Sequence, residues 1–466
     1  MPNATDQVLT AAQMRAAEMA LIDSGTSVNE LMQRAGQGAA EWVWRISGGR
    51  SVTVLCGPGN NGGDGWVIAE AIRQKGGDVA VVAAADPATS AARHARSLYG
   101  GAVLDVSANR SGEVLVDCLF GTGLTRPLSS EHHALLARLA AAHDKCVAID
   151  LPSGIDTDLG QPLSHDLPEY DLTIALGAWK PAHFLMPATA NMGALRLVEI
   201  GIGAVEGVAR PITRPRLSAP AADAHKYTRG LLSVVAGAMP GAALLAARAA
   251  QAAGAGYVRL YSEDPLDAPP DLVIDRRPLA EALLDGRISA LLIGPGLGRD
   301  GEARERLAIA LSEQRPAVLD ADALVLLGPR LLNERKAPLI ATPHDGELLA
   351  LERAFELDGS GGKAERALAL ARAARMVVVA KGADSLVAGP DGRLAYAVRA
   401  SSWLSTAGTG DVLAGTIASR LANGADAFEA ACQGVWLHSE AARLCGPAFA
   451  AEQLAEAVRA AYAACL

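Results

Sequence analysis

Short apolar runs alternate with helix-like segments along the whole chain, and this alternation predicts an α/β architecture. In the first half, six apolar runs lead into turn residues, at 51–59, 78–86, 113–123, 146–154, 171–179 and 195–203. Helical patterns come before them at 9–25 and 30–46 and separate several of them, as at 66–76 and 132–145. Strands buried on both faces are typically continuous apolar runs. We therefore expect a parallel sheet with helices on both of its faces.

The second half repeats the alternation, so we expect a second α/β unit rather than an extension of the first sheet. Its apolar runs lie at 231–237, 257–262, 290–298, 317–324, 339–347, 376–389 and 394–398, and helical patterns occupy 241–254, 410–424 and 451–466. Residues 209–220 (ARPITRPRLSAP) contain three prolines and no apolar period, which is typical of a linker. We expect one domain at 1–215 and the other at 216–466.

The composition indicates a globular protein with a core of small aliphatic side chains. Half of the 466 residues are hydrophobic, 20% are charged and only 4% are aromatic. A net charge of -9 leaves no basic excess for phosphate backbones, so a nucleic-acid partner is not expected. The six cysteines form no C-x-x-C pair, which favours free thiols over a zinc site or disulfides.

Targeting signals are missing from the sequence pattern. The first 19 residues lack the basic-then-apolar pattern of a signal peptide, and no apolar stretch reaches the ~20 residues that a membrane span needs. We therefore expect a soluble, cytoplasmic protein without a membrane partner. We also expect a homo-oligomer, of a size that the sequence does not set.

The first half contains one dense glycine motif, GPGNNGGDGW at 57–66, directly after an apolar run and before a helical pattern. Its glycines match G-x-G-x-x-G, in which small residues let the backbone approach a pyrophosphate at a helix N-terminus. The same spacing also occurs in plain strand-to-helix turns. Asn60, Asn61 and Asp64 favour a ligand site, because a turn alone does not need these polar side chains.

Two further strand ends carry polar residues. Asp117 lies in one and is followed by the glycine-rich residues 121–127, and Asp150 and Ser153 lie in another. In open α/β sheets, ligands bind beyond the carboxyl ends of the strands. Asn61, Asp117 and Ser153 offer hard oxygen ligands there, which suit an alkali or alkaline-earth cation better than zinc. Each of them alone also fits a helix cap or a strand-end hydrogen bond.

Together these segments resemble the NAD(P)H-hydrate epimerase domain. The matching text is LTAAQMRAAE, ELMQRAGQGAAE, GPGNNGGDGWVIAE, VDCLFGTGLTRP and AIDLPSGID, within residues 9–203. The resemblance implies a Rossmann-like three-layer domain that interconverts the R and S forms of a reduced nicotinamide nucleotide hydroxylated at C6. It implies potassium bound by Asn61, Asp117 and Ser153.

The resemblance also implies a set of hydrate-binding residues. They are Asn60, Asn61, Gly62, Gly63, Asp64, Gly121, Thr122, Gly123, Leu124, Thr125, Arg126, Pro127 and Asp150. Asp150 is in addition our candidate for a catalytic residue of this domain, although the sequence does not decide which acid moves protons.

The sharpest motif of the second half is STAGTGDVLAGTIAS at 405–419. Gly408, Thr409 and Gly410 form a turn before a helical pattern, and the N–H groups of such a turn can cradle a phosphoryl group in transit. Asp411 beside them is placed to accept the proton of an attacking hydroxyl. An acid is also a common choice at a helix start. The small residues around Asp411 favour the catalytic interpretation.

With HKYTRGLLSVVAG, GPGLG, LDADAL, TPHDGE and KGADSLV, this motif resembles the ribokinase-like superfamily and, within it, the ADP-dependent NAD(P)H-hydrate dehydratases. The resemblance covers roughly 224–466. It implies adenine-nucleotide contacts at Lys381, Gly382, Ala383, Asp384, Ser385 and Gly410. It implies hydrate contacts at Asp411, His344, Gly296 and Ala243. The chain departs from the family pattern at Asp345 and Tyr227, and both departures bear on loops expected near the substrate.

The combined interpretation is a bifunctional enzyme that repairs the hydrates of NADH and NADPH (NADHX and NADPHX). The first domain would equilibrate the two epimers. The second would dehydrate the S form while ADP is converted to AMP and phosphate, with magnesium and Asp411 assisting phosphoryl transfer to the C6 hydroxyl.

Two alternatives are a nicotinamide-dependent dehydrogenase and a non-catalytic nucleotide sensor. The GTGD turn gives the first no support, and Asp411 argues against the second. The sequence leaves open the preference for either hydrate, the choice of ADP over ATP beyond the resemblance, and the identity of the epimerisation base.

Overall fold

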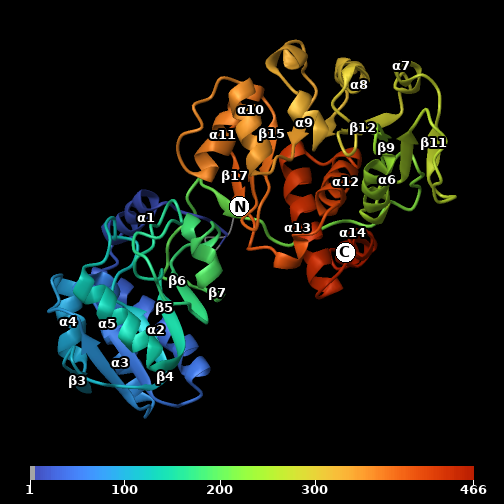
Figure 1. The fold of residues 1–466 in the computed structure, drawn as a ribbon. Coiled ribbons are helices and arrows are strands. Elements are labelled where there is room, and N and C mark those ends of the chain that lie inside the picture. The colour runs from blue at the N-terminus through green and yellow to red at the C-terminus, as the bar shows by residue number, and fades with distance from the viewer. Residues whose placement is uncertain (1–5) are drawn as a thin grey trace. The chain divides into compact units, whose positions relative to one another are not determined.

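The computed structural model describes residues 6–466, which form two compact units, one ending at Arg210 and the other beginning at Pro211. Figure 1 shows that each unit combines a sheet with helices. The expectation of two α/β units is therefore confirmed. The division between them lies inside the proline-rich segment 209–220.

The first unit is built on a seven-stranded, fully parallel sheet in the order β3-β2-β1-β4-β5-β6-β7. The strands are β1 (Val52–Cys56), β2 (Val79–Ala83), β3 (Ala102–Leu104), β4 (Gly112–Cys118), β5 (His143–Ile149), β6 (Leu172–Leu176) and β7 (Ala194–Val198). β3 was not predicted, because this short, largely exposed edge strand has no continuous apolar run. The strand order reverses between β1 and β4, which is where such sheets bind ligands.

Helices cover both faces of this sheet. They are α1 (Ala11–Asp23), α2 (Val28–Ser47), α3 (Asn60–Gln74), α4 (Ser90–Leu98), α5 (Ser130–Ala141) and the short 3-10 helices η1 (Pro181–His183) and η2 (Ala188–Asn191). Neighbouring strand residues point to opposite faces: Val54 packs with α2 and α3, whereas Leu55 packs with α5. Thr10 and Ser27 are the N-cap residues of α1 and α2, and each forms a capping box. The capping boxes fix the residue at which each helix starts.

The second unit has a ten-stranded sheet in the order β11-β10-β9-β12-β13-β14-β15-β16-β17-β8. The strands are β8 (Arg210–Pro211), β9 (Leu231–Val235), β10 (Tyr257–Tyr261), β11 (Val273–Asp275), β12 (Ile288–Ile293), β13 (Ala317–Leu319), β14 (Leu339–Ala341), β15 (Val377–Ala380), β16 (Leu386–Ala388) and β17 (Leu394–Tyr396). Strands β9 to β15 pair in parallel. β16 pairs antiparallel with β15, and β17 pairs antiparallel with β16. The parallel part places the ends of β12, β13, β14 and β15 along one edge.

The helices of this unit are rich in alanine and pack closely. They are α6 (Pro240–Ala252), α7 (Leu279–Ala282), α8 (Gly301–Ser312), α9 (Asp322–Leu326), η3 (Pro329–Leu332), α10 (Asp345–Ala354), α11 (Lys363–Ala374), η4 (Ser402–Leu404), α12 (Thr409–Ala422), α13 (Ala427–Cys445) and α14 (Ala451–Ala463). At the contact of α12 with α6, a Cβ on Gly415 would overlap the carbonyl oxygen of Ala246. The two backbones therefore touch directly.

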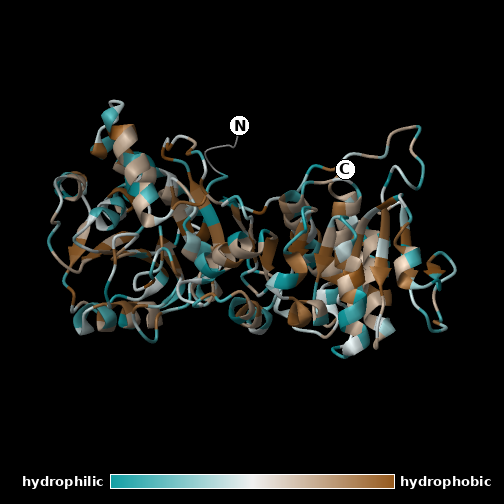
Figure 2. Cartoon of the chain, turned by 90° about the horizontal axis from the view of Figure 1, so that it is seen from above, coloured by the Kyte–Doolittle hydropathy of each residue, from teal (hydrophilic) through white to brown (hydrophobic). Residues whose placement is uncertain are grey.

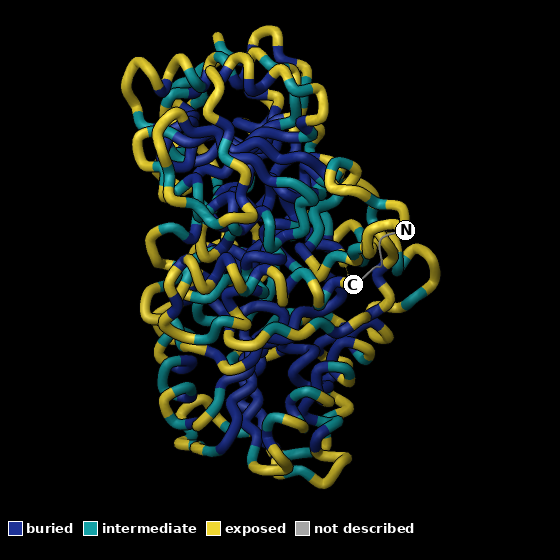
Figure 3. Tube along the Cα trace, turned by 90° about the vertical axis from the view of Figure 1, so that its right-hand side faces the viewer, coloured by how far each residue is buried: buried dark blue, intermediate teal, exposed yellow. Residues whose placement is uncertain are grey.

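The strands of both units are mostly hydrophobic, as the brown arrows in Figure 2 show. In Figure 3 the same segments are dark blue, and exposed residues gather on the loops and outer helix faces. The central strands of both sheets are thus buried on their two faces, as expected for parallel strands covered by helices. Among residues 6–466, no helix is both long enough and apolar enough to cross a membrane.

Candidate active sites

A cavity of about 550 Å³ lies at the carboxyl ends of β1, β4, β5 and β6 in the first unit. It brings together the predicted residues Asn60, Asn61, Asp64, Gly121, Thr122, Gly123, Leu124 and Asp150. Helices α1 and α2 supply the apolar side chains Met14, Leu31 and Met32 and the charged Arg15 and Glu18. The cavity therefore combines polar groups at the strand ends with an apolar wall, which is typical of a small-molecule site.

Several glycines of the 57–66 motif allow close packing of the backbone rather than contact with a ligand in the cavity. A Cβ on Gly57 would overlap the carbonyl oxygen of Leu119, and one on Gly62 would overlap that of Gly57. Gly63 likewise lies against the side chain of Met32. Of the predicted contacts, Gly62 thus lets α3 start close to the end of β1, and Gly63 lets it pack against α2, while Asn60, Asn61 and Asp64 face the cavity.

The glycine-rich loop 121–127 divides in the same way. Residues 121–124 line the cavity, and Thr122 accepts a hydrogen bond at its carbonyl oxygen from Thr157 Oγ1 over 3.2 Å. Thr125, Arg126 and Pro127 are exposed and lie outside the lining residues of the cavity. Their predicted contact with substrate has no support in the geometry of this cavity.

Asp150 is held in an unusual conformation at the end of β5. Its φ is 65°, in the left-handed region that is costly for a residue with a Cβ. Lys180 donates a hydrogen bond to Asp150 Oδ1, and the N–H of Leu176 donates to the same oxygen over 3.3 Å. His183 Nε2 donates to the carbonyl oxygen of Asp150 over 2.8 Å, since its Nδ1 accepts from the N–H of Lys180. These contacts fix the carboxylate in the cavity wall.

Lys180, in the segment ALGAWKPAH, is fully buried. Besides Asp150 it donates to the carbonyl oxygen of Leu176 over 2.7 Å. Burial lowers the pKa of His183 to about 4, so its ring is neutral and serves to position Asp150. The contacts of Lys180 and His183 with Asp150 were not predicted, because both residues lie some 30 positions after Asp150 and nothing nearby in the sequence indicates the pairing.

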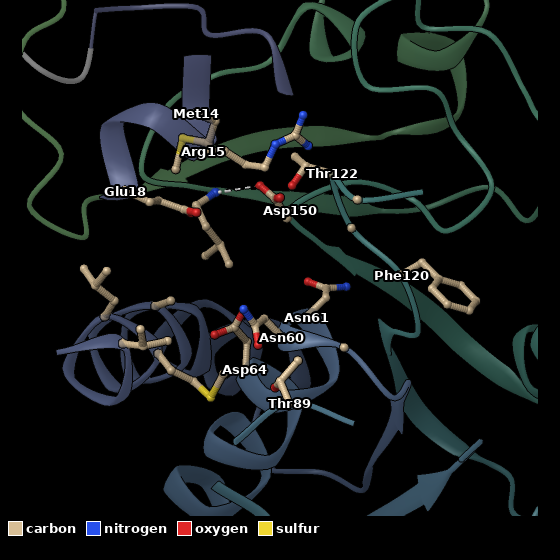
Figure 4. A pocket seen from close by; sticks show the side chains of 18 of the residues that line it. Met14, Arg15, Glu18, Asn60, Asn61, Asp64, Thr89, Phe120, Thr122 and Asp150 are labelled. Carbon is tan, nitrogen blue, oxygen red and sulfur yellow. Dashed lines mark hydrogen bonds between the residues drawn. The ribbon is translucent and has the colours of Figure 1, made fainter. Parts of the chain in front are cut away.

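Asp64 and Glu18 are two further carboxyl groups in the cavity. Burial, together with the nearby charges of Asp150 and Glu18, raises the pKa of Asp64 well above its usual range. Burial and the charge of Asp150 also raise the pKa of Glu18. Figure 4 shows Glu18 and Asp150 on one wall and Asp64 on the wall opposite. Glu18 was not predicted, although it ends the LTAAQMRAAE segment.

Asp117 and Ser153, two of the three predicted cation ligands, are in direct contact. Ser153 Oγ donates to Asp117 Oδ1 over 2.8 Å, and Tyr170 OH donates to Asp117 Oδ2 over 2.6 Å. The third, Asn61, has both side-chain amide atoms buried without a hydrogen-bond partner in the described residues. Within residues 6–466, no group of three or more His, Cys, Asp or Glu side chains is placed to hold a metal ion.

In the second unit, Asp411 is the third residue of α12, behind the turn at Gly408. Gly408 has a φ of 88°, which favours glycine. His438 Nε2 donates to the carbonyl oxygen of Thr409 over 2.9 Å and so fixes the turn from α13. Burial and the neighbouring charge of Asp320 raise the pKa of Asp411 to about 7. A carboxylate with this pKa is matched to general-base catalysis near neutral pH.

A cluster around Lys381 lies next to this turn. Lys381 Nζ donates to Asp320 Oδ1 over 2.6 Å and lies 3.8 Å from Glu347 Oε2. A Cβ on Gly410 would lie 3.5 Å from Lys381 Nζ, which places the turn beside the ammonium group. Although burial opposes it, the carboxylates of Asp320 and Glu347 raise the pKa of Lys381, so the group is cationic. Asp320 and Glu347 were not predicted as site residues, although LDADAL and TPHDGE contain them.

The remainder of the predicted nucleotide loop 382–385 is held by its own hydrogen bonds. Ser385 Oγ donates to the carbonyl oxygen of Gly382 over 2.8 Å, and Lys363 Nζ donates to Asp384 Oδ1 over 2.5 Å. Ala383 accepts at its carbonyl oxygen from the N–H of Ala400 over 2.9 Å. The loop is therefore rigidly placed next to the chain segment that follows β17.

The predicted hydrate contacts of the second unit differ in their accessibility. His344 begins α10, and its Nδ1 accepts hydrogen bonds from the N–H groups of Gly346 and Glu347 while 62% of the side chain stays exposed. Gly296 has a φ of 62° at the end of β12. The side chain of Ala243 is fully buried in the core between α6 and the sheet, so only main-chain atoms of this residue are left for its predicted contact.

A second cavity, of about 500 Å³, lies between the segment after β17 and helix α13. Trp403, Trp436, Arg399 and Arg443 contribute to its lining. The wall formed by 397–401 runs beside loop 383–385, because Ala400 bonds to Ala383. Neither tryptophan was predicted as a site residue, since RASSWLS carries no motif that relates it to the glycine turn.

The two departures from the family pattern have different positions. Asp345 directly follows His344 in the first turn of α10, at the ligand-binding edge. Tyr227 lies before the start of β9, at the opposite edge of the sheet, where Arg287 packs 4.5 Å from its ring centre and bonds its hydroxyl. The expectation that Tyr227 bears on a loop near the substrate is therefore wrong.

Comparison with known proteins accounts for both units. The family model of NAD(P)H-hydrate dehydratase matches residues 232–462, and that of the YjeF-related protein N-terminus matches residues 28–182. Among solved structures, the ADP/ATP-dependent NAD(P)H-hydrate dehydratase of Bacillus subtilis, co-crystallized with ATP and Mg²⁺, is 28% identical with a TM-score of 0.47 and covers 54% of this chain and 95% of its own.

Relatives of similar length match nearly the whole chain. The bifunctional NAD(P)H-hydrate repair enzyme of Mycobacterium leprae is 33% identical over 93% of this chain and 93% of its own length. That of Salinibacter ruber is also 33% identical, over 94% of this chain and 92% of its own. These relatives match both the unit with the 550 Å³ cavity and the unit with the turn before Asp411. The chain therefore belongs to the family of bifunctional NAD(P)H-hydrate repair enzymes.

Proposed function

We propose that the first unit interconverts the R and S hydrates of NADH and NADPH and that the second dehydrates the S form while ADP is converted to AMP and phosphate. The single observation that carries the dehydratase assignment is Asp411, whose pKa of about 7 and place behind the Gly408 turn suit a general base. The family relationship supports both activities. Fusion joins the two steps, since only one epimer is a substrate of the second.

The dehydration begins with transfer of a phosphoryl group to the C6 hydroxyl. Asp411 accepts the hydroxyl proton while the oxygen attacks the β-phosphorus of ADP, and AMP leaves. The N–H groups of the turn at Gly408–Gly410 and the ammonium of Lys381 stabilise the charge on the transferring group. The phosphate then leaves C6 with the electrons of the C–O bond, and loss of a C5 proton restores the double bond of the dihydropyridine.

Magnesium fits the donors beside Lys381. Mg²⁺ is commonly bound through one or two carboxylates together with substrate phosphates. Asp320 and Glu347 are the two carboxylates that flank Lys381, and they would hold the ion. Bound there, magnesium would neutralise phosphate charge during transfer.

The adenine moiety belongs, in this proposal, to the 500 Å³ cavity of the second unit. Its wall at 397–401 is bonded to loop 383–385, so a nucleotide with phosphates at Lys381 and Gly410 reaches it with its base. Trp403 offers an aromatic face for stacking, and stacking tolerates every purine. ADP and ATP carry the same adenine ring and differ only in the number of phosphates, so this cavity would bind both nucleotides alike.

Potassium fits the first site in part. Asn61 presents a buried amide oxygen without a partner, and Ser153 and Asp117 lie at the ends of neighbouring strands. Asp117 already accepts four hydrogen bonds, from Leu119, Tyr170 and both donors of Ser153. In this proposal Asn61 is the ligand with a free oxygen, and the buried charge of Asp117 attracts the ion.

The proposal is tested with a mixture of R and S hydrate and the full chain. Regain of the near-ultraviolet absorbance of the reduced nicotinamide ring is followed with ADP, with ATP and without nucleotide. Conversion of the entire mixture requires both activities. Conversion that stops when the S form is exhausted would refute the epimerase, and no conversion with either nucleotide would refute the dehydratase.

We also place the enzyme in the cytoplasm. All six cysteines are free, and five of them are buried. Free buried thiols are compatible with a reducing compartment.

A further inference from the structure

Two carboxyl groups face each other across the cavity of the first unit. Asp64 projects from α3 on one wall, and Asp150 projects from the end of β5 on the other (Figure 4). Met14, Leu31 and Ile200 contribute apolar surface to the same cavity, which suits an uncharged ring. A nicotinamide ring bound in this cavity would therefore present one face to each carboxyl group.

The two groups differ in their partners. Asp150 accepts hydrogen bonds from the buried Lys180 and from the N–H of Leu176, so its negative charge is compensated. Asp64 is 9% exposed and has no hydrogen-bond partner among residues 6–466. An uncompensated buried carboxylate is expensive, so Asp64 carries its proton. The direction of its pKa shift agrees with this.

An epimerisation that replaces the C6 hydroxyl with one from water needs chemistry on both faces of the ring. The C6 hydroxyl must leave on one face with a proton from an acid, and a hydroxyl must be formed on the other face while a base takes a proton. Resting on the epimerase function proposed above, we propose that Asp64 and Asp150 are a two-sided catalytic pair, in which one carboxyl group protonates the departing hydroxyl and the other accepts a proton from the incoming water.

The steps balance without a further reactant. The Asp64 proton passes to the C6 oxygen, the C6–O bond breaks to release water, and the lone pair of N1 forms an N1=C6 double bond. A water molecule adds to C6 from the Asp150 side and gives one proton to that carboxylate. Exchange of one proton with solvent restores both groups. The reverse direction uses Asp150 as the acid and Asp64 as the base.

Glu18 supports the pair electrostatically. It lies on the Asp150 wall and adds negative charge opposite Asp64, which favours the protonated form of Asp64. The intermediate with N1=C6 is cationic, and the carboxylates of Asp150 and Glu18 stabilise it. Arg15 and Lys180 are the cationic side chains near this wall, and Lys180 is already engaged by Asp150.

The first test follows the C6 oxygen. Pure R hydrate is incubated with the full chain in water enriched in ¹⁸O, without nucleotide, and the S product is analysed by mass spectrometry. The pair predicts one ¹⁸O for each epimerisation event, after subtraction of the reaction without enzyme. Retention of the original oxygen would overturn the proposal, because it would indicate that the ring opens and closes instead.

The second test is Asp64→Asn, which keeps the size of the side chain but removes its acid. We expect loss of at least about 10²-fold in kcat for epimerisation in both directions, with hydrate binding retained. Asp78→Asn is the matched control, since Asp78 is exposed at the opposite edge of the sheet and pairs only with Arg110. Thermal unfolding of both variants shows whether the fold is intact.

The outcomes separate this inference from the proposed function. If the parent chain does not interconvert the epimers, the epimerase assignment itself fails. If the parent epimerises but Asp64→Asn does so at the rate of Asp78→Asn, only the pair is refuted. If Asp64→Asn fails to fold, the oxygen experiment on the parent decides alone.

Discussion

Lys381 donates a hydrogen bond to Asp320 over 2.6 Å, and Asp320 is only 1% exposed. The two charges compensate each other directly beneath the turn that carries Asp411. Asp411 therefore experiences a nearby negative charge from Asp320 that raises its pKa and a positive charge from Lys381 that lowers it. If Asp411 is the general base proposed above, the balance of these contacts sets the pH at which the second unit works.

We predict that dehydration of pure S hydrate rises with pH around an apparent pKa of about 7. Protonated Asp411 cannot accept the hydroxyl proton, so the rate falls below this pH and reaches a plateau above it. Asp411→Asn should lose at least about 10²-fold in kcat and the pH dependence. A variant that melts normally and turns over within a few-fold of the parent would rule out Asp411 as the base.

We predict that Asp320→Asn moves this profile to lower pH. The substitution removes a negative charge near Asp411 and frees Lys381, and both changes favour the ionised form of Asp411. The midpoint of kcat against pH is the measurement, and the plateau rate reports any lost magnesium affinity separately. An unchanged or higher midpoint would contradict the coupling.

We predict that Trp403→Ala weakens nucleotide binding without unfolding the chain. Trp403 is 49% exposed, so truncation removes little core packing. Loss of one base stack, worth about 1–3 kcal/mol, corresponds to a roughly 5–150-fold higher Kd for ADP. Calorimetric titration with ADP measures it, and epimerisation in the first unit serves as the internal control. An unaltered ADP affinity would show that the adenine ring does not stack on Trp403.

We predict that Asn61→Ala abolishes any stimulation of epimerisation by potassium over sodium. Its side-chain amide atoms have no hydrogen-bond partner within residues 6–466, so their removal should leave the thermal midpoint nearly unchanged. Asp117→Ala should weaken hydrate binding as well, while dehydration of pure S hydrate stays intact in both variants. Equal rates of the parent in potassium and sodium buffers would remove the cation from the proposal.

We predict that the two activities separate when the chain is divided after Arg210. Ile212 packs in the core of the second unit, and the N–H of Leu217 bonds to the carbonyl oxygen of Cys465. A fragment of residues 211–466 should thus dehydrate S hydrate and melt at a higher temperature than one of residues 218–466. Equal melting temperatures would show that segment 211–217 contributes nothing.

The sequence was sufficient for the features that are local. A glycine turn between an apolar run and a helical pattern predicts a strand end at the ligand-binding edge, and residues 57–64 follow that rule between β1 and α3. The turn at 408–410 precedes α12 as predicted, but it follows η4 rather than a strand. The site elements that were missed depend on distant parts of the chain. Lys180 looks like an exposed strand-end lysine until the fold places it under Asp150. Asp320 and Lys381 meet only because β13 and β15 end at the same edge.

Burial could not be inferred from residue type in the helices. Alanine recurs on several faces of α6, at 242, 243, 246, 247, 249, 250 and 252, so the sequence alone cannot tell which alanine is buried. Trp403 was missed for the opposite reason. A lone tryptophan in a serine-rich loop has no periodic pattern, and its relation to the nucleotide loop arises from the hydrogen bond between Ala400 and Ala383.

The direct contact between Gly415 and Ala246 makes the position of Asp411 depend on main-chain atoms rather than on interlocking side chains. In an aliphatic core, neighbouring side chains usually change rotamer to accommodate a substitution. Where two backbones are in contact, no side chain can move to make room. Substitutions in the surrounding apolar core are therefore tolerated more easily than a change at position 415. A methyl group added at position 415 would push α12 away from α6 and so displace Asp411. The tolerance of the second unit to substitution is thus uneven, and it is narrowest at Gly415, about one turn along α12 from Asp411.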